Sequence, residues 1–233
     1  MRADGHSYSA DMEYTVFDEP AALAHATADL LQHEVEATGR IALGLAGGAT
    51  PRATYESLES RDIDWSTTAT WLTDERWVAP MNADANRRMV WDALVRTTGV
   101  QFLAPDTTLA SPEIAASRFT ETLISVLATA TRRITLLGIG ADGHTASLFP
   151  GTTALDTGGP RYVDNFVPSL DAWRLTATFD LLSESDIVYF LVAGTSKAAV
   201  VASIADGRDV PAARVTAREQ VVWLLDREAA SAL

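Results

Sequence analysis

The sequence contains no cysteine. Disulfide bonds, thiolate nucleophiles and cysteine-based zinc or iron–sulfur sites are therefore excluded. No apolar run reaches the roughly 18 residues of a membrane span, and no charged-then-apolar segment opens the chain. The sequence thus predicts neither a transmembrane helix nor a signal peptide, and we expect a cytoplasmic protein without a membrane partner.

Basic residues are also few. Lysine and arginine total 18 against 31 aspartates and glutamates, which gives a formal net charge of −13, and Lys197 is the only lysine. Contacts to a phosphate backbone need clustered lysine and arginine, so we expect no nucleic-acid partner. If the ligand is an anion, a few cations at its site must act against a repulsive overall field.

Apolar runs and helical periodicities alternate along nearly the whole chain. Strands are predicted at residues 13–17, 41–45, 68–73, 133–137, 187–192 and 221–225, and helices at 20–38, 52–60, 85–95, 112–128, 194–204 and 226–233. Two further strands, 162–167 and 174–179, form a short strand-rich insertion. We therefore expect an α/β fold, with an open, mostly parallel, Rossmann-like sheet flanked by helices on both faces.

The domain organisation follows from the same pattern. No repeat, low-complexity linker or strong boundary divides the chain, so residues 13–233 are predicted to form a single domain. Residues 1–12 are polar and unpatterned, and we expect them to be disordered.

Four polar clusters follow predicted strands, at residues 46–51, 74–76, 138–144 and 194–197. Ligands of open parallel sheets bind at the carboxyl ends of the strands, so the clusters are expected to meet at one edge. The first cluster, AGGATP, is a glycine turn before a helix, with Thr50 as the expected N-cap. Backbone N–H groups at such a helix start favour an anion.

The central stretch, residues 136–151, reads LLGIGADGHTASLFPG. Asp142 and His144 follow a glycine-rich turn at a strand end, which is typical of a catalytic corner. Alternatively, the glycines only shape a strand-to-helix turn in which Asp142 caps the helix. The stretch matches G-x-G-x-x-G literally, but its surroundings are not those of a dinucleotide-binding motif. A Walker lysine, a Gly-x-Ser-x-Gly elbow and a metal-ligand set are all missing, so we predict no cofactor and no catalytic metal.

Six shorter segments accompany this stretch in order: GGATP at 47–51, TDERWV at 73–78, Asn86-Arg87, Arg174-Leu175-Thr176, GTSKA at 194–198 and Pro211-Ala212-Ala213. Together they resemble the glucosamine-6-phosphate isomerase/6-phosphogluconolactonase family over nearly the whole chain. Family deaminases typically carry a glutamate where this chain has Phe149, and often a tyrosine where it has Arg76. Both positions favour the lactonase branch. Ala46 and Ala49 replace hydroxyl residues usual in the family's phosphate loop.

The resemblance implies hydrolysis of a small phosphorylated sugar lactone, 6-phospho-D-glucono-1,5-lactone, in the oxidative pentose phosphate pathway. It implies His144 as general base on water, Asp142 as its orienting partner or a ligand of a sugar hydroxyl, and Arg76 as a stabiliser of developing charge or a phosphate ligand. The other substrate or phosphate ligands that it implies are Gly47, Gly48, Thr50, Asp74, Arg87, Gly143, Arg174 and Lys197.

Two other functions stay open at this point: a glucosamine-6-phosphate deaminase or isomerase, and a non-catalytic sugar-phosphate sensor on the same fold. The assembly is expected to be a monomer or a small homo-oligomer. The loop at residues 152–160, rich in threonine and glycine, is a candidate lid.

Overall fold

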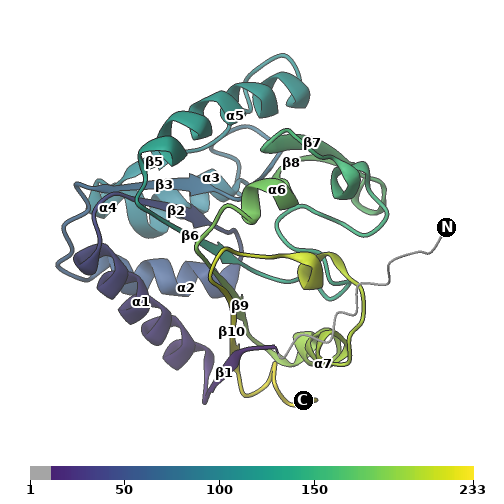
Figure 1. Cartoon of the computed structure of the whole chain (residues 1–233). Helices are drawn as coiled ribbons and strands as arrows, with labels where there is room; N and C mark the ends of the chain where they lie inside the picture. The colour runs from purple at the N-terminus through teal and green to yellow at the C-terminus, as the bar shows by residue number, and fades with distance from the viewer. Residues whose placement is uncertain (1–11) are drawn as a thin grey trace.

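The computed structural model describes residues 12–233 and shows one large parallel sheet between two layers of helices (Figure 1). The predicted disordered start, residues 1–12, lies outside the described residues except for Met12, which packs against the core. The predicted α/β class and the mostly parallel sheet are confirmed. Within the described residues, no helix is both long and apolar enough to cross a bilayer.

The large sheet has seven parallel strands in the order β1-β10-β9-β6-β2-β3-β5. Their bounds are β1 (Tyr14–Phe17), β2 (Ile41–Leu45), β3 (Thr68–Leu72), β5 (Gln101–Leu103), β6 (Arg132–Leu137), β9 (Ile187–Val192) and β10 (Gln220–Asp226). From β2 the chain winds outward through β3 to β5, then returns to β6 and winds the other way through β9 to β10. The winding reverses between β2 and β6, where doubly wound sheets bind their ligands.

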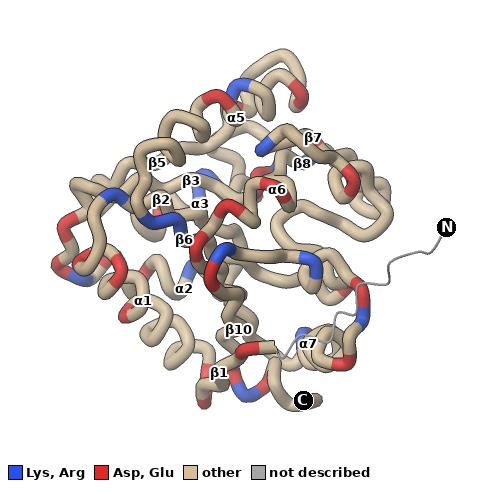
Figure 2. Tube along the Cα trace, in the orientation of Figure 1, with Lys and Arg blue, Asp and Glu red and all other residues tan. Residues whose placement is uncertain are grey.

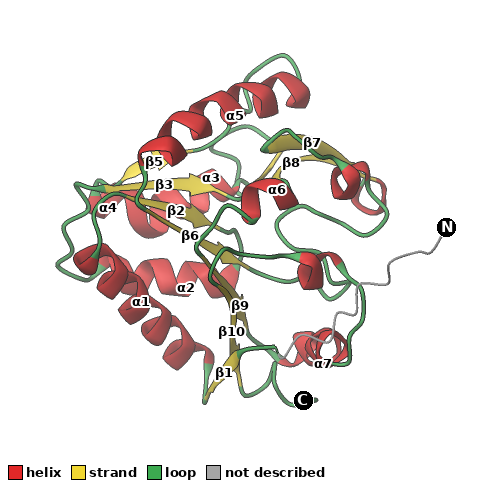
Figure 3. Ribbon diagram, viewed as in Figure 1, coloured by secondary structure: helices red, strands yellow, loops and turns green. Residues whose placement is uncertain are grey.

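Two helical layers cover the sheet (Figure 3). One contains α1 (Pro20–Ala37), α2 (Ala49–Glu59) and α3 (Asn86–Val90), which continues through a π-helical turn, Trp91–Val95, into α4 (Arg96–Thr98). The other contains α5 (Pro112–Thr129), α6 (Phe179–Leu182) and α7 (Ala198–Ala205). Short 3₁₀ turns occupy Thr153–Asp156, Pro168–Leu170, Thr195–Lys197 and Pro211–Arg214.

Successive side chains of each strand point to opposite faces of the sheet, and this divides the core into two clusters. In β9, Val188 and Phe190 face the α5–α7 layer, whereas Tyr189 and Leu191 face the α1–α4 layer. The ring of Phe190 stacks on Trp223 of β10 at a centroid distance of 4.0 Å. A strand buried on both faces explains why the sequence of β9 is one continuous apolar run.

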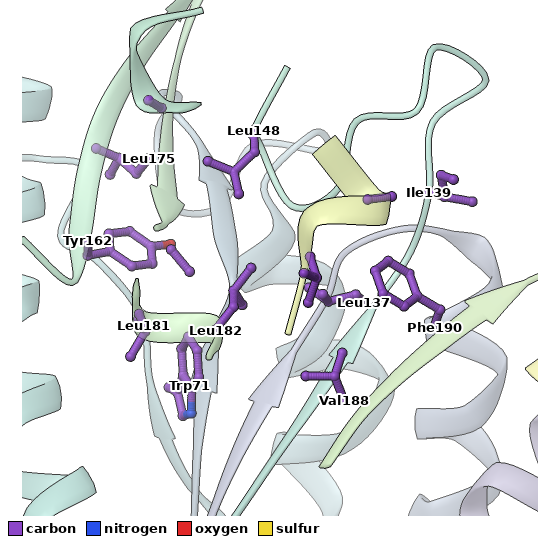
Figure 4. Packing of buried hydrophobic residues seen from close by; sticks show 14 of the residues in the cluster. Trp71, Leu137, Ile139, Leu148, Tyr162, Leu175, Leu181, Leu182, Val188 and Phe190 are labelled. Carbon is purple, nitrogen blue, oxygen red and sulfur yellow. The ribbon is translucent and has the colours of Figure 1, made fainter. Parts of the chain in front are cut away.

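The two strands of the insertion pair with a short strand that follows β3, and together they form a second, antiparallel sheet in the order β4-β8-β7, beside the α5 layer. Its strands are β4 (Asp74–Arg76), β7 (Tyr162–Val167) and β8 (Ala172–Ala177). Leu175 of β8 and Tyr162 of β7 join the core cluster that also contains Leu148 of the central stretch (Figure 4). The small sheet is thus fixed to the large one by apolar packing.

Several local predictions were wrong. Helix α2 begins at Ala49 with Gly48 as its N-cap, so Thr50 lies inside the first turn. Phe179 starts α6 instead of ending a strand, because the Thr178 side chain caps that helix. The expected closing helix is a series of turns, in which Asp226 accepts the backbone N–H of Ala229. Strand β5 was not predicted.

Candidate active site

A cavity of about 730 Å³ opens at the carboxyl ends of four adjacent strands, β9, β6, β2 and β3. Each of the four polar clusters follows one of these strands, and each contributes to the lining. Arg174, from β8 of the small sheet, also lines the cavity. The structure therefore brings residues from distant parts of the chain to one site at the reversal of the winding.

Nine of the eleven site residues suggested by the sequence line this cavity: Gly47, Gly48, Thr50, Asp74, Arg76, Asp142, His144, Arg174 and Lys197. Arg87 does not, because its guanidinium donates to the carbonyl oxygen of Ala104 at 2.9 Å. Gly143 does not either. It packs behind the turn with φ +85°, where a Cβ would lie 2.6 Å from Val210. Gly143 thus shapes the site from outside the cavity.

Asp142 and His144 form a pair within one turn. His144 Nδ1 lies 2.5 Å from Asp142 Oδ1, which also accepts the backbone N–H of His144 at 3.2 Å. Partial burial raises the pKa of Asp142, but these hydrogen bonds and the charge of His144 outweigh burial and lower it below its usual value. The second ring nitrogen of His144, Nε2, has no hydrogen-bond partner among residues 12–233, so this atom is available for proton transfer.

The imidazole ring is enclosed by its neighbours. Gly140 lies beneath it, and a Cβ there would come within 2.1 Å of His144 Nδ1 and 2.5 Å of Asp142 Oδ1. Phe149 stacks on the ring at a centroid distance of 4.0 Å and an interplanar angle of 23°. A carboxylate at one edge and close contacts on its surface hold the ring in one orientation.

No helix begins between residues 138 and 152, which excludes the alternative in which Asp142 caps one. The chain runs through turns and loop from Gly138 to Thr152 (Figure 3). Ala146 has φ +46°, a conformation that is strained for a residue with a Cβ. This turn directs Ser147 inward, where its hydroxyl donates to Asp74 Oδ2 at 2.7 Å. The candidate lid, residues 152–160, contributes nothing to the cavity lining.

The loop at residues 46–50 presents the start of α2 to the cavity. Gly48 has φ +105°, in the region that favours glycine. Gly47 packs on Asn86, whose Oδ1 would lie 2.0 Å from a Cβ at that position. Tyr55 of α2 donates its hydroxyl to Ala46 O at 2.8 Å and fixes the base of the loop. A helix start with free N–H groups suits a bound anion.

Two buried carboxylates hold the other side of the cavity. Glu75 accepts the backbone N–H groups of Arg76, Asn86 and Arg87, each at 2.7 Å, and so caps the start of α3. Burial raises the pKa of Glu75, and these hydrogen bonds oppose the rise. Asp74 accepts the Asn86 side-chain amide at 3.2 Å through Oδ1 and Ser147 through Oδ2.

Three cations, Arg76, Arg174 and Lys197, line the cavity. None has an ion pair with a carboxylate of residues 12–233. Figure 2 shows acidic residues on both helical layers, α1 and α5 among them. The cavity therefore gathers unpaired positive charge within an acidic protein, which is what an anionic ligand needs.

Sequence reasoning missed three polar lining residues, Asn86, Ser147 and Ser169. Asn86 stands beside Arg87 in the same segment, and its side chain, not that of Arg87, reaches the cavity. Ser147 lies three residues after His144 in an apolar segment without the glycines of a nucleophile elbow, so no motif indicated a role for it. Among the described residues, no three histidine, aspartate or glutamate side chains gather as metal ligands would.

The sequence profile described as glucosamine-6-phosphate isomerases/6-phosphogluconolactonase matches residues 18–223. A 6-phosphogluconolactonase of Rhizobium meliloti is 36% identical over 202 residues, which cover 80% of this chain and 84% of the relative. That of Synechocystis is 34% identical over 204 residues, covering 82% and 84%. The crystal structure of 6-phosphogluconolactonase from Thermotoga maritima superposes with a TM-score of 0.82 at 25% identity and covers 93% of this chain and all of its own.

Proposed function

The chain belongs to the glucosamine-6-phosphate isomerase/6-phosphogluconolactonase family, and on this basis we propose that it hydrolyses 6-phospho-D-glucono-1,5-lactone to 6-phospho-D-gluconate in the oxidative pentose phosphate pathway. One observation carries the proposal: an Asp142–His144 pair with a free ring nitrogen lines the same cavity as three unpaired cations. Such a site can activate water next to a phosphorylated substrate.

In the proposed reaction, His144 Nε2 removes a proton from water as the water oxygen bonds to C1 of the lactone. Asp142 holds the imidazole through Nδ1 and stabilises its protonated form. Arg76 stabilises the negative charge that develops on the C1 carbonyl oxygen. When the C1–ring-oxygen bond breaks, the imidazolium returns its proton to the ring oxygen, which becomes the C5 hydroxyl.

The 6-phosphate is proposed to bind the loop of Gly47, Gly48 and Thr50 together with Lys197. Backbone N–H groups at the start of α2 and the Thr50 hydroxyl supply donors, and Lys197 precedes α7 without an ion pair of its own. The remaining acceptor positions of Asp74 suit a sugar hydroxyl. Arg87 and Gly143 are not included, because both lie outside the cavity lining.

Phe149 favours the lactonase over the deaminase. Its ring stacks on the imidazole of His144 at the position where the deaminases carry a glutamate. Among the described residues, Asp142 is therefore the one carboxylate that contacts His144. A hydrocarbon ring cannot exchange protons with its neighbour.

The test is a direct assay of the full chain. Freshly generated lactone should disappear much faster with enzyme than by its spontaneous hydrolysis, while ammonia release from glucosamine 6-phosphate should stay at background. Ammonia release with no lactone hydrolysis would make the protein a deaminase. Tight binding of 6-phosphogluconate without acceleration of either reaction would make it a sensor.

We further propose that the enzyme acts in the cytoplasm, without a nucleic-acid partner, as a monomer or small homo-oligomer. The net charge of −13 supports the lack of a nucleic-acid partner, since it opposes binding to polyanions. Light scattering coupled to gel filtration gives the mass in solution, and cell fractionation gives the location.

A further inference from the structure

Arg76 and Arg174 lie directly opposite each other in the antiparallel pairing of β4 with β8. Like charges at directly opposite positions of a sheet destabilise it. Arg76 donates to the backbone oxygen of Asp84 at 2.5 Å, and Arg174 makes only a long contact of 3.4 Å to the oxygen of Trp173. Burial, followed by the charge of Arg76, lowers the pKa of Arg174. The two guanidiniums thus stand close together and neither forms an ion pair among the described residues, although Asp74, Glu75 and Asp84 lie near enough to oppose the lowering of the Arg174 pKa.

Two other half-buried arginines, in strand β6, do have carboxylate partners. Arg132 pairs with Glu34 and Glu219, and Arg133 pairs with Glu184. At the cavity, Asp74 is near enough to influence Arg174, but its two oxygens are engaged by Asn86 and Ser147. In a chain rich in carboxylates, two opposed and unpaired arginines that both line a cavity indicate a place for an external anion.

The cavity has a second cationic centre, Lys197. It follows β9, whereas Arg76 follows β3, and β6 and β2 lie between these strands. With about 4.8 Å between neighbouring strands, the two centres stand roughly 14 Å apart at their strand ends, with the Asp142–His144 turn between them. The side chains of both centres line the same cavity, so they border one space. Two centres suit a molecule that carries negative charge at both of its ends.

We propose that Arg174 joins Arg76 in a two-guanidinium clamp for the oxygens at C1, which makes Arg174 a further catalytic residue and not a phosphate ligand. The inference rests on the proposed lactonase reaction. As the water oxygen bonds to C1, the carbonyl π electrons move onto the carbonyl oxygen, which the clamp stabilises while His144 holds the water proton. When the C1–ring-oxygen bond breaks, that proton goes to the ring oxygen. The new C1 acid then releases a proton to solvent, and its carboxylate remains in the clamp.

Two ligands that differ only at C1 test this assignment. 6-Phosphogluconate carries a carboxylate there, and sorbitol 6-phosphate carries a hydroxymethyl group. For Arg174→Gln we expect calorimetry to show 6-phosphogluconate bound about tenfold or more weakly, with the affinity for sorbitol 6-phosphate changed less than about twofold. The kcat for the lactone should fall about 100-fold, as for loss of an oxyanion donor, with KM nearly constant. Arg174→Lys should recover part of the kcat.

The matched control is Lys197→Gln, which should weaken both ligands in parallel. The unliganded Arg174→Gln protein should unfold at the same or a higher temperature than the parent, because the variant removes a repulsion; a purely structural arginine would give a lower one. Parallel weakening of both ligands in Arg174→Gln would instead make Arg174 a phosphate ligand. The binding measurements do not depend on turnover. A protein that binds both ligands but leaves the lactone intact would refute the proposed function. The two ligands would still show which end of the molecule Arg174 binds.

Discussion

The cavity has two walls that are built in different ways. The turn wall, residues 46–50 and 138–149, is shaped by backbone turns in which glycines leave room for neighbouring side chains. The sheet wall, β4 with β8, is held by buried side chains: Glu75 caps a helix start, and Asp74 joins two segments. The comparison indicates that local chain geometry positions the proton-transfer pair, Asp142 and His144. Contacts between distant parts of the chain position the two arginines, Arg76 and Arg174.

The largest effect should come from the turn wall. His144→Ala removes the proposed base, and general-base catalysis typically contributes about 10²–10⁴-fold, so kcat/KM for the lactone should fall by that amount. The matched control is His25→Ala, since His25 bonds Ser57 of α2 and is not part of the cavity lining. A loss of only a few-fold in a folded His144→Ala protein would show that another group activates water.

The next largest effect tests whether the lack of a side chain at Gly140 is what lets Asp142 and His144 take their positions. In Gly140→Ala the new Cβ would overlap both His144 and Asp142, so kcat should fall about tenfold or more with KM little changed. Gly158→Ala is the control, because a Cβ there comes no closer than 4.0 Å to any neighbour and Gly158 lies outside the cavity lining. Equal activity of the two variants would mean that the turn does not determine the orientation of the imidazole.

Most of the fold was readable from the sequence, because its elements alternate and β9 is a continuous apolar run. The turn wall was readable too, since Asp142, His144 and Phe149 lie within one short stretch. The short strand β5 carries too few residues for a pattern, and the loop before α2 does not reveal that its helix starts at Ala49.

The sheet wall could not be predicted in the same way. The pairing of Arg76 with Arg174 depends on how β4 and β8 register, and the two strands lie far apart in the chain. The choice between Asn86 and Arg87 depends on Glu75, which binds both backbone N–H groups and thereby sets where α3 begins. A one-residue shift of that start would turn a different side chain toward the cavity.

The sheet wall should therefore respond to loss of Glu75 mainly through stability. In Glu75→Gln, an amide N–H₂ replaces one acceptor and faces a backbone donor, so we expect a loss of about 1–3 kcal/mol in the free energy of unfolding, measured with urea. Glu121→Gln, on the exposed side of α5, is the control and should change stability by less than about 0.5 kcal/mol. If Glu75→Gln is as stable as the parent, the buried carboxylate does not hold this wall.

The smallest effect concerns Asp142 and pH. Its pKa in the folded protein is lowered, so it stabilises the fold above the unfolded pKa of about 3.9, and this contribution is lost as pH falls through the folded value. Asp142→Asn should therefore unfold at a slightly lower temperature than the parent near pH 6, and this difference should shrink below about pH 4. Asp209, whose pKa is also lowered, by its hydrogen bond with Arg214, gives the same sign and lies outside the cavity lining. If Asp142→Asn unfolds at the same temperature as the parent at every pH, the turn is held by its backbone alone, and the carboxylate serves only to orient His144 for the reaction.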